Sequence, residues 1–457
     1  MKKLVALLLA LIMVFSLVAC GAKVEAPAVS EEKTEAPAKE EAPAEEKEEA
    51  PAKEEAPAET TTIQLLTWSN EGTLIALDEF NKYFTEQTGI EVVVNVVDDY
   101  NSTLDVRLAA NEADIYTTGA YTMPQVDWAG NEAPAWEARI QTGVPLDLSG
   151  YEWTSKWDRG GAAACEYDGG IYGISTGFAT TNTVYYNKQL FADNGWEIPT
   201  TWAEFEALCA EMQAAGVAPL TCGAATTWPF NVMAKCAVAS VNPDPTALIE
   251  GLWDGSRAFN DELSLETYRR IQVLIDNLEP GFMGVTYADV VGRFIAGKAA
   301  MTTDGSWQAA AYKAADPSFE FGAFPMPTDE PGAGYVGKFD AIYSINSNSD
   351  KVDACLKWFE LFTEWYANGR YSDLVAMVPT MSGVAVSDPF LQELIPYCET
   401  PVVDYGENFY QPAGLGDYAN GVGYLGLMLQ GCGGPIESYE ELAELAQADW
   451  DAAMALQ

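Results

Sequence analysis

The sequence FIAGKAAMTTDGSW, residues Phe294 to Trp307, contains a helix end, a strand and a tryptophan in one short stretch. Apolar residues at helical spacing stop at Gly297, a residue type that commonly ends helices. The small residues 299–303 then predict a buried strand, and the sequence Asp-Gly-Ser at residues 304–306 ends it. Ligands in open α/β sheets lie beyond the carboxyl ends of strands, so Trp307 is a candidate ligand platform. The same spacing is also compatible with Trp307 as a core residue.

Strand and helix patterns alternate in the first part of the globular chain. Residues 61–68, 90–97 and 113–116 read as strands, and 73–88 and 104–110 have helical periodicity. This order predicts a doubly wound parallel sheet. Because 90–97 is nearly continuous in valine, we expect that strand to be buried on both faces.

The composition excludes several functions. The chain has 457 residues and a net charge of −44, so it repels phosphate backbones and nucleic acid is not an expected partner. It contains no histidine, which removes histidine-based nucleophile systems and metal sites. We therefore expect ligand affinity to be nearly flat between about pH 6 and 8. The eight cysteines form no C-x-x-C pair, so we expect no metal or cofactor and mostly buried thiols.

The N-terminus resembles a bacterial lipoprotein signal. Lys2 and Lys3 precede an apolar run that ends in the sequence LVAC at residues 17–20. The run is short for a membrane span. The pattern predicts a signal peptide over 1–20, cleavage before Cys20 and lipidation of its thiol. An uncleaved anchor or an ordinary signal peptide is the alternative.

Residues 21–60 have a low-complexity composition. They repeat Glu-Ala-Pro-Ala five times and contain no aromatic residue. Such a segment cannot bury enough apolar surface to fold. We interpret it as a disordered tether that holds a domain away from a membrane surface.

Three motifs together resemble a known family. They are Val184-Tyr-Tyr-Asn-Lys188, the run Pro199-Thr-Thr-Trp-Ala-Glu-Phe205 and the stretch Phe294 to Trp307. In this order and spacing they resemble the extracellular solute-binding proteins (family 1) of carbohydrate ABC importers, the family that includes maltodextrin-binding protein. The resemblance covers about residues 63–450.

The resemblance implies an α/β, two-lobed periplasmic-binding-protein-like fold. Each lobe would be a doubly wound sheet flanked by helices, and crossing segments near 176–182 and 325–332 would act as hinges. The N-lobe is expected at 61–178 plus 329–370, and the C-lobe at 179–328 plus 371–457. Lobes of this kind close around a ligand held between them.

Sugar recognition requires flat aromatic surfaces together with hydrogen-bonding side chains. Trp307 matches a family position that stacks on sugar. The other candidates lie at expected strand ends, crossings and loops: Trp68, Asn70, Glu71, Asp114, Thr118, Tyr121, Thr181, Asn182, Trp228, Lys338, Asp340, Tyr410, Asp417 and Tyr418. Packing is the alternative role for the tryptophans, a structural carboxylate for Asp114, and a solvated turn for the Lys338–Asp340 pair.

The resemblance implies a monomeric receptor, anchored through Cys20 at the extracellular face of the cell membrane. It would capture a carbohydrate, an oligosaccharide rather than a single sugar, and present it to the transmembrane subunits of an ABC permease. No chemical step is expected. The alternatives are the same fold binding a peptide, polyamine or metal chelate, and a secreted glycoside hydrolase that uses paired carboxylates.

Overall fold

The first sheet of the computed structural model has five strands in the order β2-β1-β3-β11-β6. The structure describes residues 61–97, 100–121, 134–316, 318–404, 411–419, 426 and 429–457. The strands are β1 (Thr62–Thr67), β2 (Glu91–Val96), β3 (Ile115–Thr118), β6 (Ile174–Thr180) and β11 (Gly337–Ile345). β1 is parallel to β2 and β3, as the alternating pattern predicted, whereas β11 is antiparallel to both of its neighbours.

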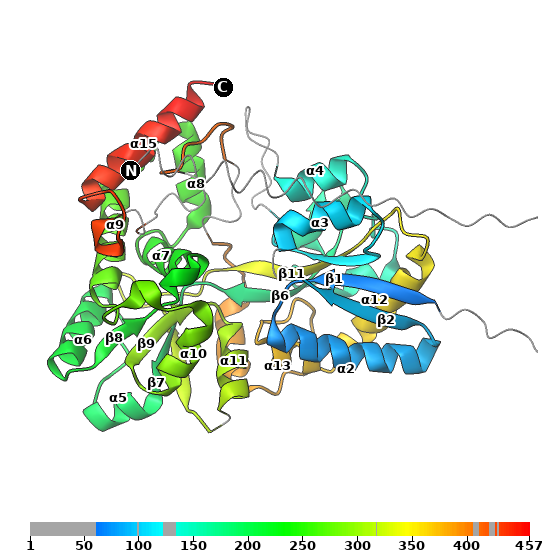
Figure 1. Cartoon of the computed structure of the whole chain (residues 1–457), viewed down its shortest axis with the longest axis horizontal. Helices are drawn as coiled ribbons and strands as arrows, with labels where there is room; N and C mark the ends of the chain where they lie inside the picture. Colours follow the sequence, from blue (N-terminus) through cyan, green and yellow to red (C-terminus); the bar gives the residue numbers. More distant parts are fainter. Residues whose placement is uncertain are drawn as a thin grey trace, which may run out of the picture. The chain divides into compact units, whose positions relative to one another are not determined.

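Helices cover both faces of this sheet, with α2 and α3 on opposite sides (Figure 1). Phe80 of α2 packs edge-on against Trp358 of α12 at 5.2 Å between ring centroids. Because long-range aromatic packing of this kind buries large apolar areas, it ties the two helices into one core. The helices of this part are α2 (Glu71–Thr88), α3 (Tyr100–Ala109), α4 (Ala135–Gln141), α12 (Val352–Tyr366) and α13 (Arg370–Val375).

The valine-rich strand β2 lies at the edge of the sheet, so the prediction that it is buried on both faces is wrong. Val93 and Val96 are each 44% exposed, and no residue of β2 is fully buried. A run of valines is compatible with either position, because β propensity reports fit to a pleated surface and not the number of neighbouring strands. The edge position is a property of the sheet order alone.

The second sheet has four strands in the order β10-β7-β9-β8. The strands are β7 (Thr183–Asn187), β8 (Ala218–Thr221), β9 (Ala299–Asp304) and β10 (Phe321–Pro325). β8 and β9 are parallel, and β7 is antiparallel to both β9 and β10. All six residues of β9 are buried, which confirms the buried strand predicted at 299–303.

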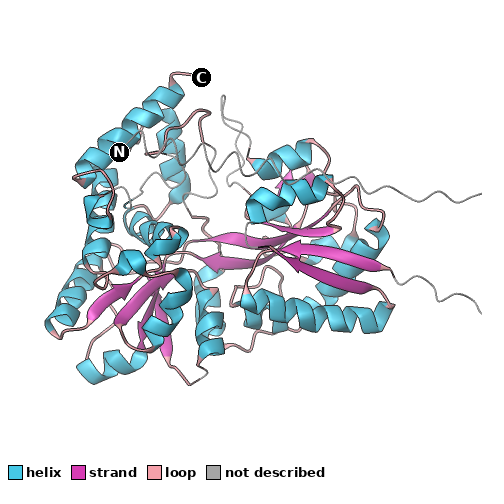
Figure 2. Cartoon of the chain, in the orientation of Figure 1, coloured by secondary structure: helices cyan, strands magenta, loops and turns pink. Residues whose placement is uncertain are grey.

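Helices also surround the second sheet (Figure 2). Gly297, at a φ of 65°, follows the end of α10 as predicted, because glycine adopts the left-handed conformation without a Cβ penalty. The helices of this part are α5 (Lys188–Asn194), α6 (Trp202–Ala214), α7 (Trp228–Val241), α8 (Pro245–Asp254), α9 (Glu262–Asp276), α10 (Tyr287–Ile295), α11 (Gln308–Ala315), α14 (Pro389–Leu394) and α15 (Tyr439–Met454). Short elements complete the described chain: η1 (Glu152–Lys156), η2 (Ala163–Cys165), β4 (Glu166–Tyr167), β5 (Gly170–Ile171), η3 (Ala224–Thr226), η4 (Phe282–Gly284), η5 (Ile395–Cys398) and η7 (Gln430–Cys432).

The segments that pass between the two sheets are hydrogen-bonded to one another. The Asn182 side chain donates to Gly334 O and accepts from Val336 N, each at 3.0 Å. Thr181 N donates to Val336 O at 2.9 Å, and Asp404 N donates to Gly337 O at 2.7 Å. The fold is therefore α/β with two sheets joined by several crossings, as the sequence predicted.

Two further expectations concern the ends and the thiols of the chain. The signal peptide, Cys20 and the tether lie outside the described residues. Among the residues that the structure does describe, no helix is long and apolar enough to cross a membrane. The seven cysteines of this part are buried thiols without a disulfide, which confirms their predicted packing role.

Candidate ligand-binding site

Three aromatic side chains gather where helices begin beyond the second sheet. Trp228 and Tyr287 lie 4.4 Å apart between ring centroids, and Trp228 and Trp307 lie 6.3 Å apart. Trp228 starts α7, Tyr287 starts α10 and Trp307 precedes α11. Because β8 and β9 are parallel, the connections after them leave the same edge of the sheet. We call Trp228, Tyr287 and Trp307 the aromatic cluster.

The position of Trp307 is set by a tight turn. A Cβ on Gly305 would lie only 2.1 Å from two atoms of the Trp307 ring, so the indole rests directly against the glycine backbone. The hydroxyl of Tyr185, on β7, donates to Gly305 O at 2.9 Å and to Ser306 O at 3.0 Å. The Trp307 Nε1–H donates to the Tyr287 hydroxyl at 3.0 Å. Backbone and side-chain contacts together therefore fix the indole.

Trp228 is the most accessible member of the aromatic cluster, at 40% exposed. It follows Thr227, whose φ of 65° and ψ of −58° are unusual for a β-branched residue. Such a conformation costs about 1–3 kcal/mol and persists only where surrounding contacts enforce it. The strained backbone places a large aromatic ring in solvent, next to Tyr287 and Trp307.

The first sheet contributes a charged pair opposite these rings. Lys338 and Asp340 lie two residues apart on β11, so both side chains point to the same face of the strand. Lys338 Nζ is 3.4 Å from an Asp340 carboxylate oxygen and 5.6 Å from the centroid of the Trp307 ring. Ala341 follows with a φ of 48°, and its N–H donates to Asp340 Oδ1 at 2.9 Å. The site thus combines residues from both sheets.

A buried carboxyl group lies beneath the aromatic cluster. Asp304 is 2% exposed, and burial raises its pKa from 3.8 to about 7. Its Oδ1 accepts from Gly305 N at 2.7 Å, and the side chains of Tyr287 and Trp307 lie beside the carboxyl. Burial likewise raises the pKa of Tyr287. The Tyr287 hydroxyl donates to Gln308 Oε1 at 2.7 Å, so a continuous polar network supports the rings from below.

Several predicted site residues have structural partners in this protein. Asn70 caps α2 by accepting from Thr73 N at 2.9 Å. Asp114 pairs with Lys351 at 3.0 Å and accepts from Ser349 Oγ at 2.6 Å. The described contacts of these side chains hold secondary structure and strand connections together.

Other candidates lie in the core or the crossings. Tyr121 is 3% exposed and stacks on Trp136 at 4.4 Å, and Trp68 packs edge-on against Tyr100 at 5.3 Å. Thr181 and Asn182 form the crossing contacts, where the Thr181 hydroxyl also donates to Asp404. Of the remaining candidates, Glu71 is exposed at the start of α2 and Thr118 is buried at the end of β3. Asp417 is exposed and Tyr418 is half-buried. Tyr410 lies outside the described residues.

Sequence reasoning missed Tyr287 and Asp304. A local signal for Tyr287 was present, because Thr286 and Asp289 form a capping box that starts α10 immediately before the aromatic ring. Asp304 had been interpreted only as part of a strand-breaking turn. Tyr287, which lies beside its carboxyl, comes from a different element, so no local pattern encodes this contact.

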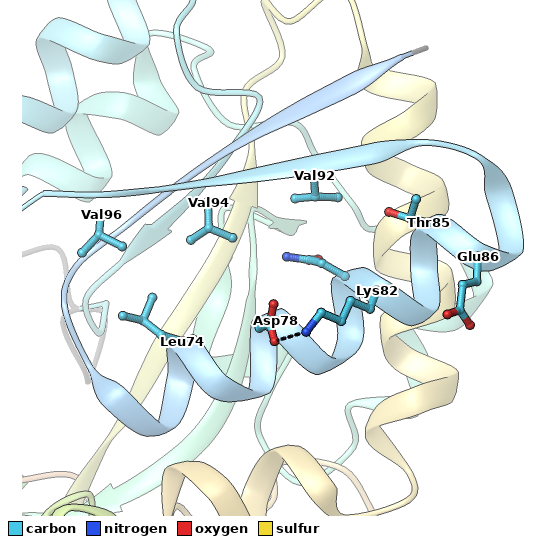
Figure 3. A pocket seen from close by; sticks show the side chains of 9 residues that line it. Leu74, Asp78, Lys82, Thr85, Glu86, Val92, Val94 and Val96 are labelled. Atoms are coloured by element: carbon cyan, nitrogen blue, oxygen red, sulfur yellow. Dashed lines mark hydrogen bonds and ion pairs between the residues drawn. The ribbon is translucent and has the colours of Figure 1, made fainter.

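A separate groove lies at the far edge of the first sheet. It encloses about 610 Å³ between α2 and the edge strand β2 (Figure 3). Leu74 of α2 faces Val94 and Val96 of β2 across it, and Asp78 and Lys82 pair at 2.7 Å on its helical side. None of its lining residues belongs to the aromatic cluster or to the predicted site.

Two α/β sheets joined by crossings, with aromatic and charged side chains brought together from both, define a two-lobed binding-protein fold. The family described as bacterial extracellular solute-binding proteins matches residues 78–393 of this chain. The chain therefore belongs to this family, and the resemblance inferred from the sequence is confirmed.

Individual relatives are similar over part of their length. The multiple sugar-binding protein of Streptococcus mutans is 30% identical over 212 residues, which are 45% of this chain and 50% of that protein. The osmoprotective compounds-binding protein GgtB of Synechocystis is 32% identical over 151 residues, 32% of this chain and 34% of its own length. The matched stretches thus span half or less of these curated relatives.

Solved structures match over more of the chain. RafE in complex with raffinose has a TM-score of 0.67 at 21% identity, covering 86% of this chain and 100% of its own. A chitin oligosaccharide binding protein has a TM-score of 0.67 at 20% identity, covering 87% and 100%. A sugar transporter protein from Bacillus licheniformis in complex with stachyose has a TM-score of 0.62 at 16% identity, covering 86% and 100%. At these identities the likeness establishes the shared fold.

Replacing Gly305 with alanine should displace the Trp307 indole. The new Cβ would overlap the ring, and overpacking of this kind costs about 1–3 kcal/mol of stability. Near-ultraviolet circular dichroism would report the moved tryptophan, and thermal unfolding would report the loss. Gly292→Ala is the matched control, because a Cβ there meets open space on α10 and should be neutral or stabilising. Equal behaviour of the two variants would contradict the proposed packing of Trp307.

Proposed function

We propose that this chain is an extracellular, lipid-anchored receptor that captures an oligosaccharide between its two lobes and delivers it to an ABC importer. The observation that carries the proposal is the arrangement at Trp307. Trp307, which lies beside Trp228, faces Lys338 of the first sheet, and Lys338 pairs with Asp340. Sugars present apolar C–H faces that stack on rings and hydroxyls that bind carboxylates and ammonium groups. The site supplies both kinds of partner.

The relatives support a carbohydrate as the solute. The family binds solutes, and the names of similar proteins mention multiple sugars, raffinose, stachyose and a chitin oligosaccharide. We propose the aromatic cluster, Lys338 and Asp340 as the ligand contacts. The lobe boundaries expected from the sequence, 61–178 plus 329–370 and 179–328 plus 371–457, remain part of the proposal, except that α13 packs in the core of the first sheet and so extends the N-lobe beyond residue 370.

The anchoring and delivery steps of the proposal rest on sequence features. The LVAC motif at residues 17–20 supports lipidation of Cys20, and the repeats of 21–60 support a tether between lipid and receptor. The permease subunits would be separate chains, and the receptor would act as a monomer. Transport would follow from the higher affinity of the ligand for the closed state, without a chemical step.

Titration calorimetry of the full-length protein tests the solute class. The panel contains raffinose, stachyose, a chitin trisaccharide, single sugars, a tripeptide and spermidine. We expect saturable heats with at least one oligosaccharide and none with the peptide or the polyamine. Binding of only the peptide or the polyamine would overturn the carbohydrate assignment. Release of phenol from aryl glycosides would instead identify a hydrolase.

Asp304 should make folding stability depend on pH. Burial raises its pKa from the ordinary aspartate value of 3.8 to about 7, so the folded state holds the proton more tightly than the unfolded chain. The contribution of this group is fully present below about pH 4 and is lost as the pH rises to about 7. The melting temperature of the wild type should therefore fall relative to that of Asp304→Asn as the pH rises from about 4 to about 7. Above about pH 7 the difference between the two melting temperatures should stay constant. Parallel curves would contradict the raised pKa. The expectation of a nearly flat ligand affinity between about pH 6 and 8 concerns binding rather than folding stability, and it remains a separate prediction.

A further inference from the structure

The ring of Trp307 is covered by a cation that the protein itself supplies. Lys338 Nζ lies 5.6 Å from the Trp307 ring centroid, in the range of a cation–π contact. The ammonium also pairs with Asp340 at 3.4 Å, and the two side chains are only 15% and 12% exposed. The contact joins β11 of the first sheet to the start of α11 in the second. An internal cation therefore occupies the surface on which a ligand is proposed to stack.

Without this ammonium, the same surroundings would suit an organic cation. Aromatic faces bind quaternary ammonium groups through cation–π attraction, and a carboxylate beside the ring would add to that attraction. Asp340 would remain as a negative charge with little solvent, which is unfavourable unless a cation compensates it. The protein as a whole has a net charge of −44, so small cations are already concentrated around it.

We propose that Lys338 is a specificity-determining residue that reserves the Trp307 ring for neutral ligands. It acts as the permanent cation of the site: it neutralises Asp340 and excludes charged amines from the ring. A neutral sugar can displace the ammonium from the ring while the ammonium keeps its ion pair with Asp340. A cationic solute would have to displace the ammonium from the ring and would then lie close to it, so the two positive charges would repel each other. The inference rests on the proposed function, because it takes Trp307 as the ligand platform.

The test compares a cation with a neutral molecule of the same shape. Tetramethylammonium and tert-butanol are titrated at constant ionic strength against the wild type and Lys338→Met, with tryptophan fluorescence as the readout. Lys338→Met keeps the apolar stem and removes the charge. We expect it to bind tetramethylammonium about tenfold more tightly than the wild type, with no comparable gain for tert-butanol. No gain, or an equal gain for both probes, would overturn the proposal.

Two further variants test the parts of the argument separately. Lys338→Met combined with Asp340→Asn removes the uncompensated carboxylate and should abolish the gain. Lys313→Met is the matched control, because Lys313 Nζ lies 5.5 Å from the Phe390 ring centroid, outside the site, and its removal should leave cation binding unchanged. A gain that survives Asp340→Asn, or that Lys313→Met reproduces, would overturn the role of Lys338.

The experiment separates this inference from the proposed function. Thermal unfolding confirms that each variant is folded, and Lys338→Gln, which keeps a donor for Asp340, replaces the methionine variant if that variant does not fold. Raffinose and stachyose are titrated in parallel. If no carbohydrate binds the wild type but Lys338→Met gains the cation, the carbohydrate proposal fails while the exclusion of cations from the Trp307 ring by Lys338 stands. If carbohydrate binds and no variant gains the cation, only this inference fails.

Discussion

Trp307→Ala should weaken carbohydrate binding by roughly 30-fold, about 2 kcal/mol, as expected for a stacked aromatic anchor. The indole is fixed by the Gly305 turn and by its hydrogen bond to Tyr287, so little side-chain entropy is lost when a ligand stacks on it. Titration calorimetry against the tightest sugar of the panel measures the effect. Trp307→Phe should retain part of the affinity, because a smaller flat ring remains.

A matched tryptophan controls for general destabilisation. Trp196 is half-buried and packs edge-on against Phe191 at 5.8 Å, at the margin of the core around the second sheet. Trp196→Ala should lower the melting temperature without changing the sugar affinity of the folded protein. If Trp307→Ala behaves in the same way, Trp307 is a packing residue, which is the alternative that its sequence context left open.

Lys235→Met should lower the free energy of unfolding by about 3–5 kcal/mol, because it removes one partner of a buried ion pair. Lys235 of α7 pairs with Asp404 at 3.3 Å, and both side chains are 2% exposed. Thr181 of the first crossing donates its hydroxyl to the same carboxylate. The pair therefore joins α7 to two segments that pass between the sheets. Urea-induced unfolding, followed by circular dichroism, measures the loss.

Two variants make this result specific to a buried charge. Lys235→Met combined with Asp404→Asn should recover much of the lost stability, since both charges of the buried pair are then removed together. Lys82→Met removes a lysine whose pair with Asp78 is mostly in solvent, at 71% and 63% exposed, and should leave stability nearly unchanged. A loss in Lys235→Met no larger than in Lys82→Met would contradict the importance of the buried pair.

Local signals in the sequence were sufficient for most of the secondary structure near the site. Gly297 after α10 and the buried strand β9 were both predicted and are present, and the capping box of Thr201 and Glu204 that begins α6 is another local signal. Each signal depends on a few adjacent residues: a periodicity, a left-handed glycine or a cap. The order of these signals also indicated the family.

The choice among polar candidates could not be made in this way. Asn70 and Asp114 have side chains that suit a sugar, yet the first caps a helix and the second pairs with Lys351. An amide or a carboxylate has the same hydrogen-bonding groups whether it binds a sugar or stabilises the fold. Only the residues that surround it in the folded protein differ between the two roles. Likewise, the valines of β2 did not indicate whether another strand lies beside them.

For Trp307, the sequence by itself determined a small turn that places a tryptophan beyond the end of a buried strand. The tertiary structure decided what surrounds it: Tyr287 and Trp228 from other helix starts, Asp304 beneath it and Lys338 over its ring. The physical reason is the range of the interactions. A turn or strand depends on neighbouring residues, whereas a contact between Trp307 and Lys338 exists only once two separately folded sheets have been joined.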